Sequence, residues 1–213
     1  MYKISTIFLL LLFCNYNSQI INEIGKEELQ KVTTKNHEKS SGLNINISYP
    51  ADWTKTDGKR PHMLFNFAST DKSIRSTFGI TNILESASTS DKKAFSLLSD
   101  KDIAEIMTQN FPNSANCSEY FEGMGFENIR NSTCRTTKIE GLKSSVASTF
   151  GTIRRAEFSI DNYMVYYQVP YKTNLIVISF NFHNVVSEQD RYLADNLSNK
   201  IMNSMIINNL WKK

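Results

Sequence analysis

Two Ser-x-x-Lys pairs are the residues of this 213-residue sequence whose type and spacing come closest to a catalytic motif. Ser69 with Lys72, and Ser90 with Lys93, match the spacing at which a lysine can activate a serine nucleophile. The companion Lys-Thr-Gly motif is interrupted by Asp57. Because chance produces such pairs in a chain rich in Ser and Lys, we predict no catalytic residue.

Acidic and histidine side chains do not stand at the spacings that metal sites use. Glu119, Glu122 and Glu127 flank a Gly-Met-Gly sequence and could ligate a hard cation, but the spacing is not that of an EF-hand. A solvated acidic loop is the simpler interpretation. The three histidines are far apart in the sequence: His37, His62 and His183. We therefore predict no metal site and no cofactor site.

The first 18 residues (1–18) predict an export signal. Lys3 is followed by an uninterrupted apolar run from Ile7 to Phe13, which is too short to span a bilayer. The end of this run is similar to a lipobox that would make Cys14 a lipidated N-terminus, although Phe13 stands where that motif prefers a small residue. The alternatives are cleavage near residue 18 and an uncleaved N-terminal helix. We expect a periplasmic or secreted protein that meets the membrane only through a lipid on Cys14.

Once Cys14 is removed or lipidated, two cysteines remain, Cys117 and Cys134. In an exported protein such a pair predicts one disulfide, which would stabilise the fold by roughly 3 kcal/mol on the chain-entropy estimate. The alternative is two separately buried thiols. Neither cysteine lies in a Cys-x-x-Cys motif, so redox catalysis is not predicted.

Composition and charge define one folded domain preceded by a polar segment. With 40% hydrophobic residues the chain can form a core, whereas a net charge of +3 does not indicate binding to nucleic acid. Residues 19–42 are polar and lack periodicity, so we expect a tether, with at most a short helix around Glu27–Lys31. The domain is expected to span residues 43–213.

Alternating hydrophobic residues predict a series of strands, clearest near the end of the chain. Ile176, Ile178, Phe180 and Phe182 share one face, and a hairpin at 172–174 precedes them. Helices are predicted to begin with capping boxes at Ser99 and Ser187. The terminal helix has apolar residues at four-residue intervals and is expected to cover the dry face: Leu193, Leu197, Ile201 and Met205, widened by Tyr192, Met202 and Ile206. The fold class is α+β, an antiparallel β-sheet sandwich with a helix between strand groups and a C-terminal helix packed on the sheet.

The opening of this domain resembles the PsbP-like superfamily, which includes exported bacterial proteins of the PsbP and DcrB type. The resemblance is carried by Ile47-Ser48-Tyr49-Pro50-Ala51-Asp52-Trp53, in which a strand ends at Tyr-Pro and a Trp follows two residues later. An early strand at 63–67, the late hairpin and the closing helix also fit. The resemblance implies an exported accessory protein without enzymatic activity that docks to something larger.

A cluster of tyrosines is the candidate docking surface. Tyr163, Tyr167 and Tyr171 share one face of a predicted strand, and any that face away from the terminal helix would be exposed to a partner. We therefore expect an exported accessory or binding protein that docks an unidentified protein partner in the cell envelope. Two alternatives stay open: a periplasmic immunity protein that neutralises a secreted toxin, and a hydrolase with an unrecognised site.

Overall fold

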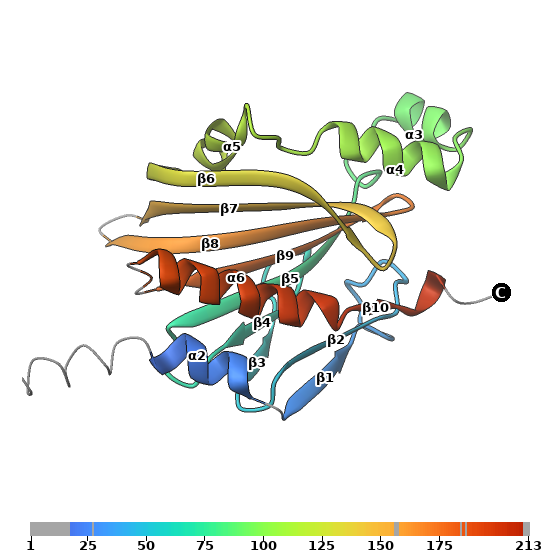
Figure 1. Cartoon of the computed structure of the whole chain (residues 1–213). Coiled ribbons are helices and arrows are strands. Elements are labelled where there is room, and N and C mark those ends of the chain that lie inside the picture. The colour runs from blue at the N-terminus through green and yellow to red at the C-terminus, as the bar shows by residue number, and fades with distance from the viewer. Residues whose placement is uncertain (1–17, 27, 156–157, 184, 186, 211–213) are drawn as a thin grey trace, which may run out of the picture.

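The computed structural model describes residues 18–210, apart from 27, 156–157, 184 and 186, and places them in two antiparallel sheets flanked by helices (Figure 1). Residues 1–17, with Cys14 and nearly all of the predicted export signal, lie outside this range. None of the described helices is long and apolar enough to cross a membrane. The predicted α+β class is confirmed.

Seven strands form the larger sheet, in the order β3-β4-β5-β9-β8-β7-β6. Their bounds are β3 (Thr54–Asp57), β4 (Met63–Ala68), β5 (Ile74–Asn82), β6 (Phe126–Ile139), β7 (Leu142–Arg155), β8 (Phe158–Tyr171) and β9 (Asn174–Phe182). Between β5 and β6 the chain forms three helices rather than the single one expected: α3 (Thr89–Phe95), α4 (Asp100–Gln109) and α5 (Cys117–Gly123). The pairing of β5 with β9 joins the early strands to the late ones.

One face of this sheet carries the main core, as the alternation predicts. The side chains of Phe180 and Phe182 on β9 are fully buried. Helix α6 (Glu188–Asn203) lies on this face and begins with the predicted capping box at Ser187 (Figure 1). Tyr192 was expected to widen its apolar stripe but is 62% exposed, because it lies on the side of the helix that faces away from the sheet.

The hairpin between β8 and β9 turns at Lys172 and Thr173, whereas the sequence predicted a loop of three residues that ends at Asn174. The left-handed residue is Lys172, with φ 54°. Asn174 was expected to take that conformation, but it already pairs with Tyr171 as the first residue of β9.

The predicted tether is wrong, because residues 18–26 and 28–34 belong to the fold. The segment forms helix α2 (Ser18–Gly25) and strand β1 (Leu29–Thr33), where a helix was expected. Strand β1 pairs along its whole length with β2 (Ile45–Pro50), which also pairs with the short β10 (Ile206–Ile207). The side chains of Lys31 and Thr33 are exposed on the outer side of this small sheet, whereas Val32 points into the core. A single buried residue in five is too weak a signal for a strand.

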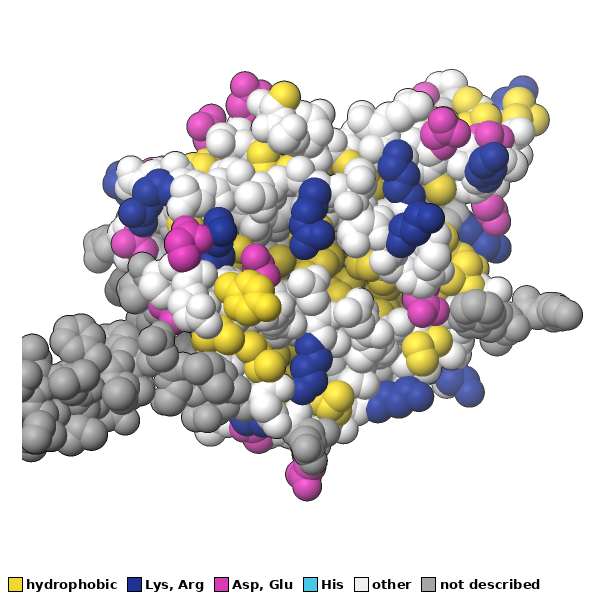
Figure 2. All heavy atoms as spheres, viewed as in Figure 1, with side chains coloured by type: hydrophobic (Ala, Val, Ile, Leu, Met, Phe, Trp, Pro, Cys, Tyr) yellow, Lys and Arg dark blue, Asp and Glu magenta, His cyan; other side chains and the backbone are white. Residues whose placement is uncertain are grey.

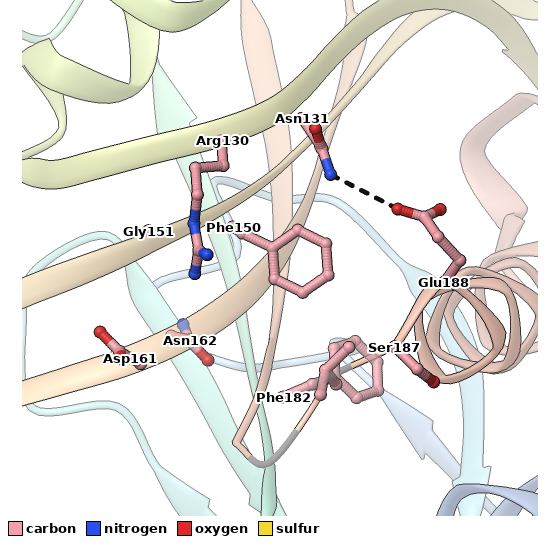
Figure 3. Close-up of a pocket in the computed structure, with 10 residues that line it drawn as sticks. Arg130, Asn131, Phe150, Gly151, Asp161, Asn162, Phe182, Ser187 and Glu188 are labelled. Atoms are coloured by element: carbon pink, nitrogen blue, oxygen red, sulfur yellow. Dashed lines mark hydrogen bonds between the residues drawn. The ribbon is translucent and has the colours of Figure 1, made fainter.

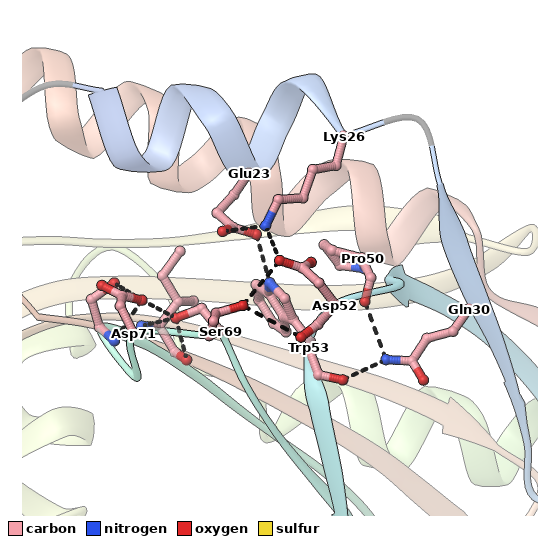
Figure 4. A network of polar contacts seen from close by, with 11 residues as sticks. Glu23, Lys26, Gln30, Pro50, Asp52, Trp53, Ser69 and Asp71 are labelled. Atoms are coloured by element: carbon pink, nitrogen blue, oxygen red, sulfur yellow. Dashed lines mark hydrogen bonds and ion pairs between the residues drawn. The ribbon is translucent and has the colours of Figure 1, made fainter.

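A polar network fastens α2 to the rest of the domain (Figure 4). Glu23 is buried, and its carboxylate accepts a hydrogen bond from the indole Nε1–H of Trp53 at 2.6 Å. Lys26 Nζ lies 2.6 Å from Glu23 Oε1 and 2.6 Å from Asp52 Oδ2. The Trp of the Tyr-Pro-x-x-Trp motif is therefore a structural anchor whose ring packs against Tyr49.

Replacing Glu23 with alanine is expected to destabilise the protein, because the buried indole N–H of Trp53 loses its acceptor. The free energy of unfolding should fall by about 1–3 kcal/mol, the usual effect of leaving a buried donor unpaired. Urea denaturation followed by tryptophan fluorescence measures it. Glu23→Gln, which keeps an oxygen acceptor, should recover most of the loss. An alanine variant as stable as the wild type would contradict the anchoring role.

The other face of the larger sheet carries a second, smaller core beneath α5, and α4 lies against β7 and β8 (Figure 1). The predicted disulfide between Cys117 on α5 and Cys134 on β6 is present. It lies among buried hydrophobic residues that α5, β6, β7 and β8 contribute: Phe121, Phe126, Ala147 and Met164. Helix α4 begins with the capping box predicted at Ser99. The disulfide therefore ties the inserted helices to the edge strand β6.

Candidate functional site

The tyrosines predicted to dock a partner are buried beneath α6. Tyr163 and Tyr167 are 1% and 2% exposed, and Tyr171 is buried as well. The register places Tyr163 opposite Phe182 and Tyr167 opposite Ile178, on the face that α6 covers. The prediction of an exposed tyrosine surface is therefore wrong. Alternation along β8 groups these residues correctly, but it does not say which face the helix covers.

The buried tyrosines instead fasten α6 to the sheet. The hydroxyl of Tyr163 donates to Asp195 Oδ1 at 2.7 Å, and that of Tyr167 donates to Asn199 Oδ1 at 2.8 Å. Burial raises the pKa of Tyr163 and of Tyr167. Burial also raises the pKa of Asp195, although the Tyr163 hydroxyl and the charge of Arg191 act in the opposite direction. A half-buried carboxylate therefore lies between the helix and the sheet.

The carboxylate of Asp195 is expected to make stability fall as pH rises. Because its pKa is raised in the folded state, the folded protein holds this proton at pH values where the unfolded chain has lost it. The stabilisation that comes from this retained proton is fully present below about pH 4. It is lost as pH rises through the pKa that Asp195 has in the folded protein. Asp195→Asn keeps an acceptor for Tyr163 and cannot titrate. Its melting temperature relative to the wild type should therefore increase between pH 4 and pH 7, and a constant difference would contradict the assignment.

The serine and histidine candidates of the sequence lie apart and have structural surroundings. Ser69 donates to Asp71 Oδ1 at 2.6 Å and accepts from the Ile74 N–H at 3.0 Å, which closes a tight turn. Ser90 and Lys93 are exposed on α3. His37 packs edge-on against a phenylalanine ring, His62 lies 3.7 Å from a surface glutamate, and His183 follows β9.

The acidic candidates are also dispersed. Glu119 and Glu122 are exposed on α5, and Glu127 pairs with Arg154 at 3.2 Å. In the part of the chain that the structure describes, no three His, Cys, Asp or Glu side chains are placed to hold a metal ion.

A pocket that the sequence did not reveal opens where the start of α6 meets the ends of β6, β7, β8 and β9 (Figure 3). Its volume is about 740 Å³. We call it the Arg130 pocket. Its lining comes from all five elements and the loop before α6: Arg130, Asn131, Phe150, Gly151, Asp161, Asn162, Phe182, Val185, Ser187 and Glu188. Phe150 and Phe182 give it an apolar floor, and charged side chains form its rim (Figure 3).

Two irregularities in β6 place Arg130 at this pocket. The pairing of β6 with β7 shifts between Glu127 and Arg130, and again between Arg130 and Thr133. Asn128 and Asn131 take left-handed conformations, with φ 52° and 53°. Such bulges re-aim side chains and are common beside functional sites. Here they set Arg130 opposite Phe150, with its guanidinium reaching into the pocket (Figure 3).

Arg130 differs from the acidic side chains of the pocket in having no partner. Within the described residues, its guanidinium forms no ion pair and no hydrogen bond. Asp161 Oδ1 accepts from Thr152 Oγ1 at 2.6 Å. Glu188 lies 2.7 Å from the guanidinium of Arg191 and 3.4 Å from Asn131 Nδ2. The pocket therefore contains one guanidinium without a partner, and its two carboxylates already have hydrogen-bond or ion-pair partners.

Comparison with known proteins finds similarity in fold alone. No family model matches the chain, and no curated protein matches its sequence. The chain is similar to the solution structure of PsbP (CyanoP) from the cyanobacterium Synechocystis, with 12% identity over 86% of this chain and 94% of that one, and a TM-score of 0.49. It is also similar to LpqN of Mycobacterium tuberculosis, described as involved in cell envelope biogenesis, with 12% identity over 88% and 96% of the two chains and a TM-score of 0.38. PsbP is the protein whose superfamily the Tyr-Pro-x-x-Trp opening resembles.

The side chains of the Arg130 pocket can bind a ligand. Its serine, Ser187, donates its hydroxyl to Asp190 Oδ2 at 2.7 Å in the capping box. An arginine without a partner above an aromatic floor can bind an anionic group joined to an apolar one. Sequence analysis missed this site because the left-handed asparagines leave no periodic pattern. The Asn128 and Asn131 pair, three residues apart inside a predicted strand, is the one signal that was available.

Proposed function

We propose that this chain is an exported accessory protein of the cell envelope, without enzymatic activity, that binds a protein partner at the Arg130 pocket. The export segment and the resemblance of the Tyr-Pro-x-x-Trp opening support the location and the general role. The observation that carries the proposal is the unpartnered guanidinium of Arg130, held between two bulges above Phe150. Strained backbone is retained where it serves a purpose, and here it presents a charge that the fold itself does not use.

The surface around the pocket suits a partner larger than a small molecule. In the space-filling view the same face of the molecule shows hydrophobic side chains in a hollow beside the middle of α6, with Lys and Arg side chains above it (Figure 2). Tyr192, 62% exposed, projects from α6 one turn after Glu188. Exposed aromatic and arginine side chains near an apolar hollow are characteristic of binding hot spots.

Site-specific photo-crosslinking in the native host tests this proposal. A photoreactive amino acid at Tyr192, in the full chain, should form an adduct with one protein that mass spectrometry identifies. The same group at Thr56, exposed on β3 at the opposite edge of the sheet, is the matched control and should not form it. Arg130→Ala should abolish the adduct and weaken binding of the purified partner. The proposal fails if no adduct depends on both Tyr192 and Arg130.

A further inference from the structure

We infer that the Arg130 pocket recognises the C-terminal carboxylate of the partner chain, together with an apolar last side chain. This rests on the proposed function and names the group that the pocket receives. An arginine guanidinium matches a carboxylate with two parallel hydrogen bonds, and Arg130 has no competing acceptor within the described residues. The first contact of the ligand is therefore its carboxylate with Arg130.

The charges around Arg130 favour a single negative charge over a phosphate. Asp161 and Glu188 line the same pocket and repel a dianion. Within the described residues neither carboxylate forms an ion pair with Arg130, and Glu188 pairs with Arg191 instead. A carboxylate that carries one charge can reach the guanidinium between them. Their remaining oxygen lone pairs can accept N–H groups from the last peptide units of the ligand.

The floor and size of the pocket specify an apolar terminal residue. Phe150, Phe182 and Val185 line its bottom, so a large apolar side chain would be removed from water there. A volume of about 740 Å³ lies within the range of pockets that hold ligands, and it suits the last few residues of a peptide. The expected ligand therefore ends in a residue such as Phe or Leu with a free carboxylate.

Calorimetric titration of the full mature chain with matched peptides tests the inference. The probes are acetyl-Ala-Ala-Phe with a free carboxylate, the same peptide as its C-terminal amide, free phenylalanine and inorganic phosphate. The free acid should bind at least about 10-fold more tightly than the amide, because a charge-assisted hydrogen-bond pair is lost. Arg130→Ala should lose this preference and Arg130→Lys should keep part of it. Arg154→Ala, on β7 outside the pocket lining, is the control and should bind as the wild type does.

Three results would overturn the inference: equal binding of acid and amide, tighter binding of free phenylalanine or phosphate than of the peptide acid, and no binding of any peptide. Each leaves the proposed function standing if the Tyr192 adduct still forms and depends on Arg130. Loss of that adduct would instead remove the proposed function itself. Circular dichroism of Arg130→Ala separates lost binding from lost structure. It should match the wild type, because the guanidinium forms no hydrogen bond and no ion pair within the described residues.

Discussion

Phe180→Ala is expected to lower the free energy of unfolding by about 3–5 kcal/mol, the largest effect of any single substitution considered for this protein. The ring is fully buried in the second half of β9, a strand that lies between β5 and β8. It meets the ring of Tyr167 edge-on at a centroid distance of 6.1 Å and lies 6.5 Å from that of Phe182. Rigid strands on both sides limit collapse of the cavity, so the cost should lie in the upper part of the range for large-to-small changes.

The neighbouring residue supplies the control for this experiment. Ser179 precedes Phe180 but faces the other side of the sheet, where it is half-buried. Ser179→Ala should change the unfolding free energy by no more than about 0.5 kcal/mol. Urea denaturation followed by circular dichroism gives both values. If the two variants unfolded at the same urea concentration, the assignment of the main core to the face beneath α6 would be wrong.

Removal of the disulfide is the second large effect. Cys117 and Cys134 close a loop with a sequence separation of 17, and the chain-entropy estimate for such a loop is about 3 kcal/mol. The double variant Cys117→Ser, Cys134→Ser should therefore unfold at lower urea than the oxidised wild type. Reduced wild type should behave similarly, and reductant should not affect the double variant further.

The position of the disulfide predicts which part of the domain loses stability when the bridge is removed. It connects α5 to β6 within the smaller core, whereas β9 belongs to the main core. Amide hydrogen exchange should accelerate in α5 and in the first half of β6 and stay unchanged in β9. Acceleration spread evenly over both cores would show that the bridge acts on the whole domain and not on its inserted helices.

Strong local signals identified the late strands and the capped helices correctly. In β9 every second side chain is buried, because successive side chains of a strand point to opposite faces of the sheet. This alternation depends only on the residues of the strand itself. The capping boxes at Ser99 and Ser187 were also predictable, because each is closed by residues three positions apart. The Cys117–Cys134 pair followed from counting the cysteines of an exported chain.

Weak or non-local signals led to the errors. Strand β1 carries one buried residue in five and is stabilised by its partner β2, so its sequence resembled a tether. Helix α2 depends on Glu23 reaching Trp53, a contact across 30 positions of sequence. The prediction for Tyr163 and Tyr167 failed because Asp195 and Asn199, which receive their hydroxyls, lie 32 positions away on α6.

The amino-acid order alone thus determined the fold class, the face of β9 that is dry, the starts of two helices and the one cysteine pair, since each depends on residues near one another or on a count. Only the folded chain decided which sheet face α6 covers, and that the two asparagine bulges of β6 bring Arg130 over Phe150 beside the start of α6. That pocket joins segments from Arg130 to Glu188, and their meeting depends on sheet register and helix packing, which no local pattern encodes.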